Sequence, residues 1–167
     1  MIKVAIRADG SPLIGMGHIM RCLTLATNFK ASGHKVYFIS KCTSGIDKVK
    51  SQGFEVIQLK DTTLEAEAQE VVSIINAYSI EVLVIDTYNV SQDYFLTIKS
   101  QVKKLCYIDD VNKFVYPVDI LINGNITGEY LNYKKYSSDE IMLLGPKYNL
   151  IREEFKGLCE RKIDKEV

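Results

Sequence analysis

The chain of 167 residues carries 21 basic and 21 acidic residues, so its formal net charge is zero with both histidines neutral. Proteins that bind nucleic acids normally carry a basic excess, so this balance argues against a nucleic-acid partner. Hydrophobic residues make up 47% of the chain, enough for one sizeable core, and the length is too short for two full-sized domains. Composition therefore indicates a neutral, soluble, single-domain protein that handles a small molecule.

The cysteines and the amino terminus argue against several other classes. The four cysteines, at positions 22, 42, 106 and 159, include no Cys-x-x-Cys pair, and the only histidines are His18 and His34. Zinc sites need clustered ligands, so we expect reduced thiols, no metal and no cofactor. The amino terminus lacks the apolar core of a signal peptide, and no apolar run is long enough to span a bilayer. We therefore expect a cytoplasmic protein.

Short runs rich in Val and Ile alternate with longer stretches whose apolar residues recur at helical spacing. Strands are predicted over residues 2–7, 35–40, 54–59, 82–85, 105–108, 119–122 and 141–144. Helices are predicted over residues 18–32, 46–51, 64–75 (capped by Asp61 or Thr62) and 92–103, whereas the polar, tyrosine-rich segment 123–139 receives no assignment. This alternation predicts an α/β fold with a Rossmann-like, doubly wound, mainly parallel sheet over residues 1–150.

The carboxyl-terminal tail, residues 151–167, differs from the rest of the chain. From Arg152 onward ten of sixteen residues are charged, and a few apolar residues keep a weak helical spacing among them. Two interpretations stay open: a solvated terminal helix that packs on the domain, or a linker into a second domain.

Polar side chains follow most of the predicted strands at their carboxyl ends. They are Arg7, Asp9, Ser40, Asp86, Thr87, Tyr88, Asp109, Asp110 and Asn123. Ligands of open α/β sheets bind in the crevice beyond these ends, although any single Asp can equally cap the next helix. The collective pattern therefore predicts a ligand site at this edge of the sheet.

The loop after the first strand contains the sharpest local signal, Gly15-Met-Gly17-His18. Met20 stands where a dinucleotide fingerprint needs its third glycine, and no P-loop Lys-Ser or Lys-Thr follows, so NAD and ATP sites are disfavoured. The glycines instead let backbone amides approach an anion at a helix amino terminus. His18 then lies in the first helical turn, where a neutral imidazole can act as a general base, with Asp9 as the candidate to orient it.

Four ordered blocks span nearly the whole chain: Arg7-Ala-Asp9, Gly15-Met-Gly17-His18-Ile-Met-Arg21, Ile85-Asp86-Thr87-Tyr88 and Gly145-Pro-Lys-Tyr148-Asn-Leu-Ile-Arg152-Glu-Glu-Phe155. In these blocks the chain resembles the nucleotide-sugar hydrolases of pseudaminic acid biosynthesis, a family that includes proteins labelled spore coat polysaccharide biosynthesis proteins. The resemblance implies one half of a GT-B fold, in which two Rossmann-like domains face each other across a cleft. This chain is then the amino-terminal half, and residues 151–167 lead toward a carboxyl-terminal GT-B domain that it does not contain.

The resemblance also implies an activity and a set of site residues. Enzymes of this family release UDP from UDP-2,4-diacetamido-2,4,6-trideoxy-β-L-altrose, by attack of water at the anomeric carbon and without a metal. Their pattern implies that His18 positions or deprotonates the water and that Tyr88 lies near the sugar. The implied substrate-binding residues are Asp9, Gly15, Gly17, Arg21 and Asp86. With half of the active site, the chain alone is expected to be weakly active or inactive.

Three other functions stay open at this point. A glycosyltransferase of the same architecture transfers the sugar to an acceptor hydroxyl instead of water. A non-catalytic module binds a sugar nucleotide or assembles with a partner through the charged tail. A metal-dependent phosphohydrolase uses Asp86, Asp109 and Asp110 to hold magnesium.

Overall fold

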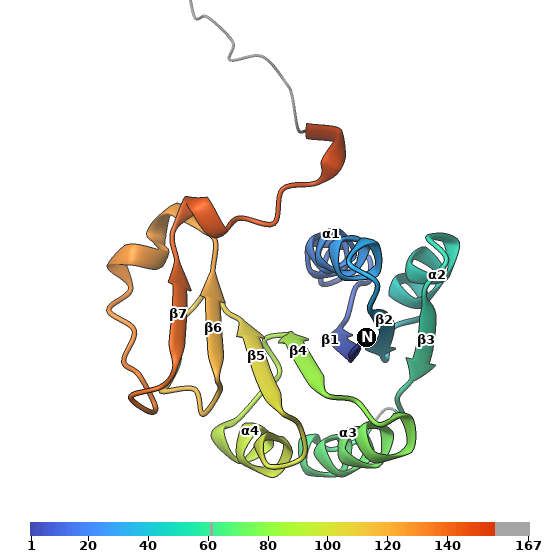
Figure 1. Ribbon diagram of the computed structural model, residues 1–167, viewed down its shortest axis with the longest axis horizontal. Helices are drawn as coiled ribbons and strands as arrows, with labels where there is room; N and C mark the ends of the chain where they lie inside the picture. Colours follow the sequence, from blue (N-terminus) through green and yellow to red (C-terminus); the bar gives the residue numbers. More distant parts are fainter. Residues whose placement is uncertain (61, 156–167) are drawn as a thin grey trace, which may run out of the picture.

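Figure 1 shows the computed structural model, which describes residues 1–60 and 62–155. Its central sheet has seven strands in the order β3-β2-β1-β4-β5-β6-β7, and every neighbouring pair is parallel. The strands are β1 (Lys3–Ala8), β2 (Lys35–Ser40), β3 (Glu55–Gln58), β4 (Val82–Asp86), β5 (Lys104–Ile108), β6 (Ile120–Asn123) and β7 (Ile141–Leu144). The predicted Rossmann-like parallel sheet is confirmed.

Helices cover both faces of the sheet, with α1 and α2 on one face and α3 and α4 on the other (Figure 1). They are α1 (Gly17–Ala31), α2 (Thr43–Ser51), α3 (Leu64–Tyr78) and α4 (Gln92–Lys99). Three short 3₁₀ turns follow β6 and β7, namely η1 (Ile126–Tyr130), η2 (Pro146–Tyr148) and η3 (Glu153–Phe155). Within the described ranges, none of the helices combines the length and the hydropathy needed to cross a membrane.

The sheet separates two apolar cores, because successive residues of a strand point to opposite faces. Val4 and Ile6 of β1 pack on the side of α1, together with Ile19. Ala5 of the same strand packs on the side of α3 and α4, as does Phe95 of α4. Since both faces are covered, the strands read as continuous apolar runs, which is why they were predictable from sequence.

Several element boundaries differ from the predicted ones. Thr63 is the N-cap of α3, where its side chain accepts from the Ala66 amide at 3.3 Å, so the cap expected at Thr62 is wrong; Asp61 lies outside the described residues. Helix α4 ends at Lys99 rather than near 103, because the Lys103 and Lys104 amides donate to the Glu81 carbonyl at 2.9 and 3.2 Å. Of the tail over residues 151–167, for which a terminal helix is one of the two interpretations, the structure describes only the part up to Phe155, which contains the 3₁₀ turn η3; residues 156–167 lie outside the described ranges.

A cluster of charges is buried under the carboxyl end of β1. The Arg7 side chain is 1% exposed, and its Nε donates to Glu67 Oε1 of α3 at 2.8 Å while Nη1 lies 2.7 Å from Asp9 Oδ2. Tyr94 donates its hydroxyl to Glu67 at 3.0 Å, and Lys41 Nζ lies 2.5 Å from the other Glu67 oxygen. Burial alone would lower the pKa of Arg7, but Asp9 and Glu67 raise it above its ordinary value. These ion pairs tie β1, α3 and the loop after β2 together.

Replacing Arg7 with Met is expected to lower the free energy of unfolding by about 3–5 kcal/mol, the usual cost of breaking a buried ion pair from one side. Asp9 and Glu67 are then buried without their main counter-charge. Urea denaturation measures the loss. The matched control is Lys35→Met, which breaks the exposed Lys35–Glu55 pair of 3.1 Å and should cost less than about 1 kcal/mol. Equal losses in both variants would contradict the role given to Arg7.

The same cluster makes stability depend on acid pH. Burial by itself would raise the pKa of Glu67 and of Asp9, yet the Arg7 charge and their hydrogen bonds hold both pKa values below the ordinary ones. A carboxylate with a lowered folded pKa stabilises above its unfolded pKa, about 4 for these groups, and this stabilisation is lost as the pH falls through the folded value. We therefore expect urea midpoints to drop below about pH 4. The drop should be smaller in Arg7→Met; an equal drop would assign it to other groups.

Candidate active site

The polar cluster that the sequence predicts lies where the order of the sheet reverses. Strand β1 is flanked by β2 on one side and by β4 on the other, so the connections after β1 and β4 diverge. This is the position at which open α/β sheets bind ligands. Helix α1 begins there at Gly17, immediately after the loop that follows β1.

A histidine and a buried carboxylate form the centre of the site. Asp86 is the last residue of β4 and is fully buried, and its Oδ1 lies 2.6 Å from Nδ1 of His18 in the first turn of α1. Such a short contact with a carboxylate requires a proton on Nδ1, so the nearby Arg21 Nη2, 3.2 Å from the same nitrogen, cannot also donate to it. In the neutral ring, Nε2 therefore carries the free lone pair.

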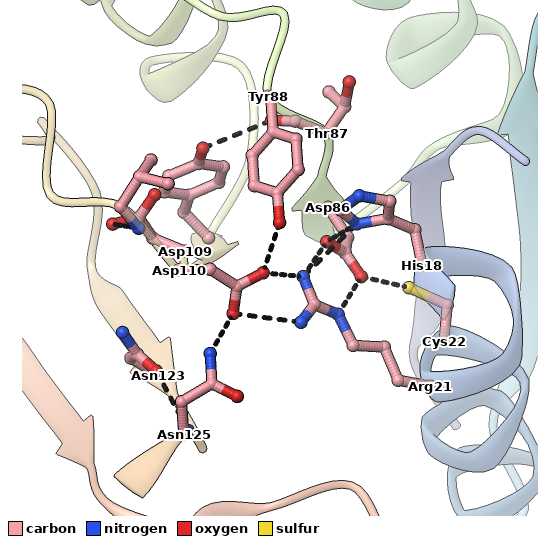
Figure 2. Close-up of polar contacts among 12 residues, drawn as sticks. His18, Arg21, Cys22, Asp86, Thr87, Tyr88, Asp109, Asp110, Asn123 and Asn125 are labelled. Carbon is pink, nitrogen blue, oxygen red and sulfur yellow. Dashed lines mark hydrogen bonds and ion pairs between the residues drawn. The ribbon is translucent and has the colours of Figure 1, made fainter. Parts of the chain in front are cut away.

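Arg21 joins two carboxylates that come from different strands (Figure 2). Its Nε and Nη2 donate to the two oxygens of Asp86, each at 2.6 Å. Its Nη1 and Nη2 also donate to Asp110, after β5, at 3.1 and 2.9 Å. The Sγ of Cys22 adds a fourth contact to Asp86 at 3.3 Å. His18, Arg21 and Cys22 lie at three- and four-residue steps, so among the described residues one face of α1 supplies every donor to Asp86.

Tyr88 lies over the histidine on the solvent side. The two rings meet edge to face, with centroids 4.8 Å apart, and Tyr88 is 45% exposed. Its hydroxyl donates to Asp110 Oδ2 at 2.8 Å, as Figure 2 shows. Burial and this hydrogen bond raise the pKa of Tyr88 to about 12, so the hydroxyl keeps its proton at neutral pH.

A pocket of about 220 Å³ opens beside the His18 ring. Its lining residues are Asp9, Ile14, His18, Asp86, Thr87, Tyr88 and Asn89. Gly15 lies in the loop between β1 and α1, next to Ile14, and Gly17 begins α1. A Cβ built at either glycine would meet nothing within 4 Å. A larger hollow of about 530 Å³ lies elsewhere, but its charged residues Glu81 and Lys103 pair with each other at 2.6 Å.

The structure brings most of the predicted site residues together and corrects one pairing. The orienting partner of His18 is Asp86, so the expectation that Asp9 orients the ring is wrong. Asp9 instead accepts from Ser40 Oγ and the Lys41 amide at 3.0 and 2.8 Å and pairs with Arg7. Sequence reasoning did not single out Asn89 or Ile14 as pocket residues, because neither type carries a chemical signal on its own.

The arrangement around Arg21 does not suit the magnesium site that was considered. Asp86 and Asp110 face the Arg21 guanidinium, which already supplies a positive charge between them. The neighbouring Asp109 is buried and uses Oδ2 to accept from the Val111 and Asn112 amides and the Tyr133 hydroxyl. In the part of the chain that the structure describes, no three His, Cys, Asp or Glu side chains are grouped as metal ligands.

The chain is similar in sequence to two curated proteins, and no family model matches it. It is 31% identical to an uncharacterized protein of Methanocaldococcus jannaschii, over 99% of this chain and 35% of that protein. It is 30% identical to the UDP-2,4-diacetamido-2,4,6-trideoxy-beta-L-altropyranose hydrolase of Campylobacter jejuni, over 98% of this chain and 58% of the hydrolase. The chain thus spans about a third to somewhat over half of the length of these relatives.

Two solved structures share the fold of this chain. Acinetobacter baumannii MurG matches with a TM-score of 0.63 and 11% identity, over 86% of this chain and 45% of MurG. A glycosyltransferase from Rickettsia africae matches with a TM-score of 0.63 and 13% identity, over 85% of this chain and 42% of that enzyme. At these identities the likeness concerns the fold alone. In each case the matched region is less than half of the other protein.

The geometry predicts the tautomer of His18. With Asp86 on Nδ1, ¹⁵N NMR of the neutral imidazole should show the proton on Nδ1 and a bare Nε2. His34→Ala leaves His18 as the single histidine and removes any ambiguity of assignment. Asp86→Asn, which removes the charged acceptor, should shift the population toward the Nε2–H form. A ring that already carries its proton on Nε2 in the His34→Ala chain would rule out the pairing described here.

Proposed function

We propose that this chain supplies the general-base half of a nucleotide-sugar hydrolase, which releases UDP from a UDP-diacetamido-trideoxy sugar. The observation that carries the proposal is the His18–Asp86 pair at the mouth of the pocket. Within the described residues, no hydrogen-bond partner occupies Nε2 of His18, and the side chain is 12% exposed. A buried carboxylate behind an accessible imidazole is the arrangement used to remove a proton from a nucleophile.

The proposed reaction is a displacement at the anomeric carbon. A water molecule held at Nε2 of His18 attacks this carbon and forms the new C–O bond, while its proton moves to Nε2. The bond between the anomeric carbon and the diphosphate oxygen breaks, and UDP leaves with the electron pair. Asp86 keeps the ring oriented and stabilises the imidazolium that forms, because its carboxylate is bonded to Nδ1–H.

Two observations support the assignment to UDP-sugar chemistry. The Campylobacter jejuni relative is by name a hydrolase of a UDP-diacetamido sugar, and the identity of 30% extends over 98% of this chain. The site also lies at the sheet edge where folds of this type bind their ligands. We further propose that residues 1–150 are the amino-terminal domain of a GT-B enzyme, that residues 151–167 lead to its second domain, and that the enzyme works in the cytoplasm on surface or spore coat polysaccharide precursors.

The substrate residues of this proposal follow from the pocket. Tyr88 lies at the sugar, since its ring forms the exposed wall beside His18. Asp9 faces the same pocket and can accept a hydrogen bond from a sugar hydroxyl or acetamido group. Gly15 and Gly17 do not line the pocket; their part in the proposal is that, without side chains, they let a ligand come close to the backbone beside Ile14, which does line it. Arg21 and Asp86 act behind these residues, because their polar atoms are bonded to one another.

A glycosyltransferase is the second candidate, because the Rickettsia africae protein that shares this fold is by title a glycosyltransferase. In that case a sugar or lipid hydroxyl takes the place of water at Nε2 of His18. The two activities are distinguished by measuring UDP release from the UDP-sugar with and without candidate acceptors. Release that needs no acceptor supports the hydrolase, and release that requires one supports the transferase. A non-catalytic module is expected to bind the sugar nucleotide without any turnover.

His18→Ala is expected to lower the turnover of the two-domain enzyme by about 10²–10⁴-fold, the usual contribution of a general base. The matched control is His34→Ala, since His34 lies in the turn before β2 and contacts Phe29 rather than the pocket. Release of UDP from the altrose derivative is the measurement. Unchanged turnover in His18→Ala would remove the histidine from the mechanism, and equal losses in both variants would point to a general loss of folding.

A further inference from the structure

Asp110 lies on the far side of Arg21 from Asp86, two residues after the end of β5 (Figure 2). Its Oδ1 accepts hydrogen bonds from Arg21 Nη1 at 3.1 Å and from Asn125 Nδ2 at 2.7 Å. Its Oδ2 accepts from Arg21 Nη2 at 2.9 Å and from the Tyr88 hydroxyl at 2.8 Å. A carboxylate offers about four lone-pair sites, so these contacts use its full capacity.

We propose, building on the function proposed above, that Asp110 is a positioning residue that sets both the geometry and the charge around His18. It does not line the pocket and has no free lone pair for a substrate group or a cation. Three segments meet at its carboxylate: α1 through Arg21, the loop after β4 through Tyr88, and the segment after β6 through Asn125. Nothing else among the described contacts connects all three.

The geometric part of the role concerns Tyr88. A tyrosine that is 45% exposed would ordinarily sample several rotamers in solvent. The hydrogen bond to Asp110 holds the hydroxyl end of this side chain, and the ring then stays edge to face with His18 at 4.8 Å. Asp110 thereby fixes the wall of the pocket beside His18.

The electrostatic part follows from counting charges. Asp86 and Asp110 carry two negative charges and Arg21 carries one positive charge, so the group bonded to His18 has a net charge of minus one. Burial would raise the pKa of Asp110, but its hydrogen bonds and the Arg21 charge lower it, so the carboxylate stays ionised. When His18 accepts a proton, the cluster becomes neutral. Without Asp110 the same step would leave the cluster, including the His18 ring, with a net positive charge, although only 12% of this side chain is exposed to water.

The other groups around His18 do not supply this counter-charge. Asp9 lines the pocket but is paired with Arg7 at 2.7 Å. Burial raises the pKa of the Cys22 thiol well above its ordinary value, so this side chain is neutral. Tyr88 is also neutral, since its pKa is raised to about 12. The positive charge of Arg21 balances one of the two carboxylates, Asp86. The second carboxylate, Asp110, therefore gives the group around His18 its net negative charge.

Asp110→Asn tests the proposal, because the amide has nearly the same shape but lacks the charge and points N–H donors at other donors. In the two-domain enzyme we expect kcat to fall by about 10- to 100-fold with little change in KM, as for groups that orient a catalytic residue. The acidic limb of the pH–rate profile should move to lower pH. In ¹⁵N NMR of the His34→Ala chain, His18 should take up its second proton at lower pH as well.

Two further variants separate the charge from the geometry. Asp139→Asn makes the same change in net charge at an exposed residue whose carboxylate contacts Ser138, and should alter neither the kinetics nor the NMR titration. Tyr88→Phe removes one hydrogen bond of Asp110 and keeps its charge. It should lower kcat and leave the pH profile in place.

The proposal is overturned if Asp110→Asn matches Asp139→Asn in both kinetics and NMR. Should the Asp110→Asn chain fail to fold by circular dichroism, Asp110→Glu decides, since it keeps the charge and displaces the carboxylate; an unchanged kcat in that variant overturns the positioning role. The NMR arm needs no substrate. If the His18 titration shifts in Asp110→Asn but the enzyme shows no UDP-sugar turnover, the proposed function is refuted and the charge effect of Asp110 stands. If the enzyme turns over the UDP-sugar but neither its kinetics nor the His18 titration change in Asp110→Asn, only the inference about Asp110 is refuted.

Discussion

The site depends on one constraint, which is that the carboxylate of Asp86 is fully buried at the end of a central strand. A buried charge is tolerated only when it is paired and its lone pairs are occupied. Here the donors are His18, Arg21 and Cys22, which lie on one face of α1 at positions i, i+3 and i+4. The need to satisfy Asp86 thus fixes how the first turns of α1 dock on β4, and this docking places the imidazole at the pocket.

Two buried charge clusters lie on opposite faces of the same sheet and serve different ends. The cluster of Arg7 with Glu67 is closed, since both side chains are 1% exposed or less, so it ties β1 to α3. The cluster of Arg21 with Asp110 is partly open, with 24% and 15% of these side chains exposed. An open cluster contributes less to stability per contact because water screens it. It is, however, the one that is bonded to His18, through Asp86.

Much of the fold could be predicted because the strands are runs of Val and Ile that end at polar residues. The pairing of His18 was harder, since Asp9 and Asp86 both follow apolar strands. Alternation along the strands separates them in the structure. Val84 packs on the α1 side of the sheet, so Asp86, two residues later, also faces α1. Ala5 packs on the α3 side, so Arg7, two residues later, faces α3 and holds Asp9 there by their ion pair. Strands that are apolar on both faces hide this assignment, because no polarity difference marks which face meets α1.

The adjacent residues Asp109 and Asp110 show the same effect at the end of β5. Because neighbouring side chains point to opposite sides, Asp109 turns inward to Tyr133 and the amides of its own loop, and Asp110 turns toward Arg21. The sequence marks both as strand-end carboxylates and cannot rank them. Their difference arises from partners distant in sequence, since Arg21 lies 89 residues before Asp110. A carboxylate at a strand end therefore acquires its role from the helix that happens to cover its face, and only the packed sheet reveals which helix that is.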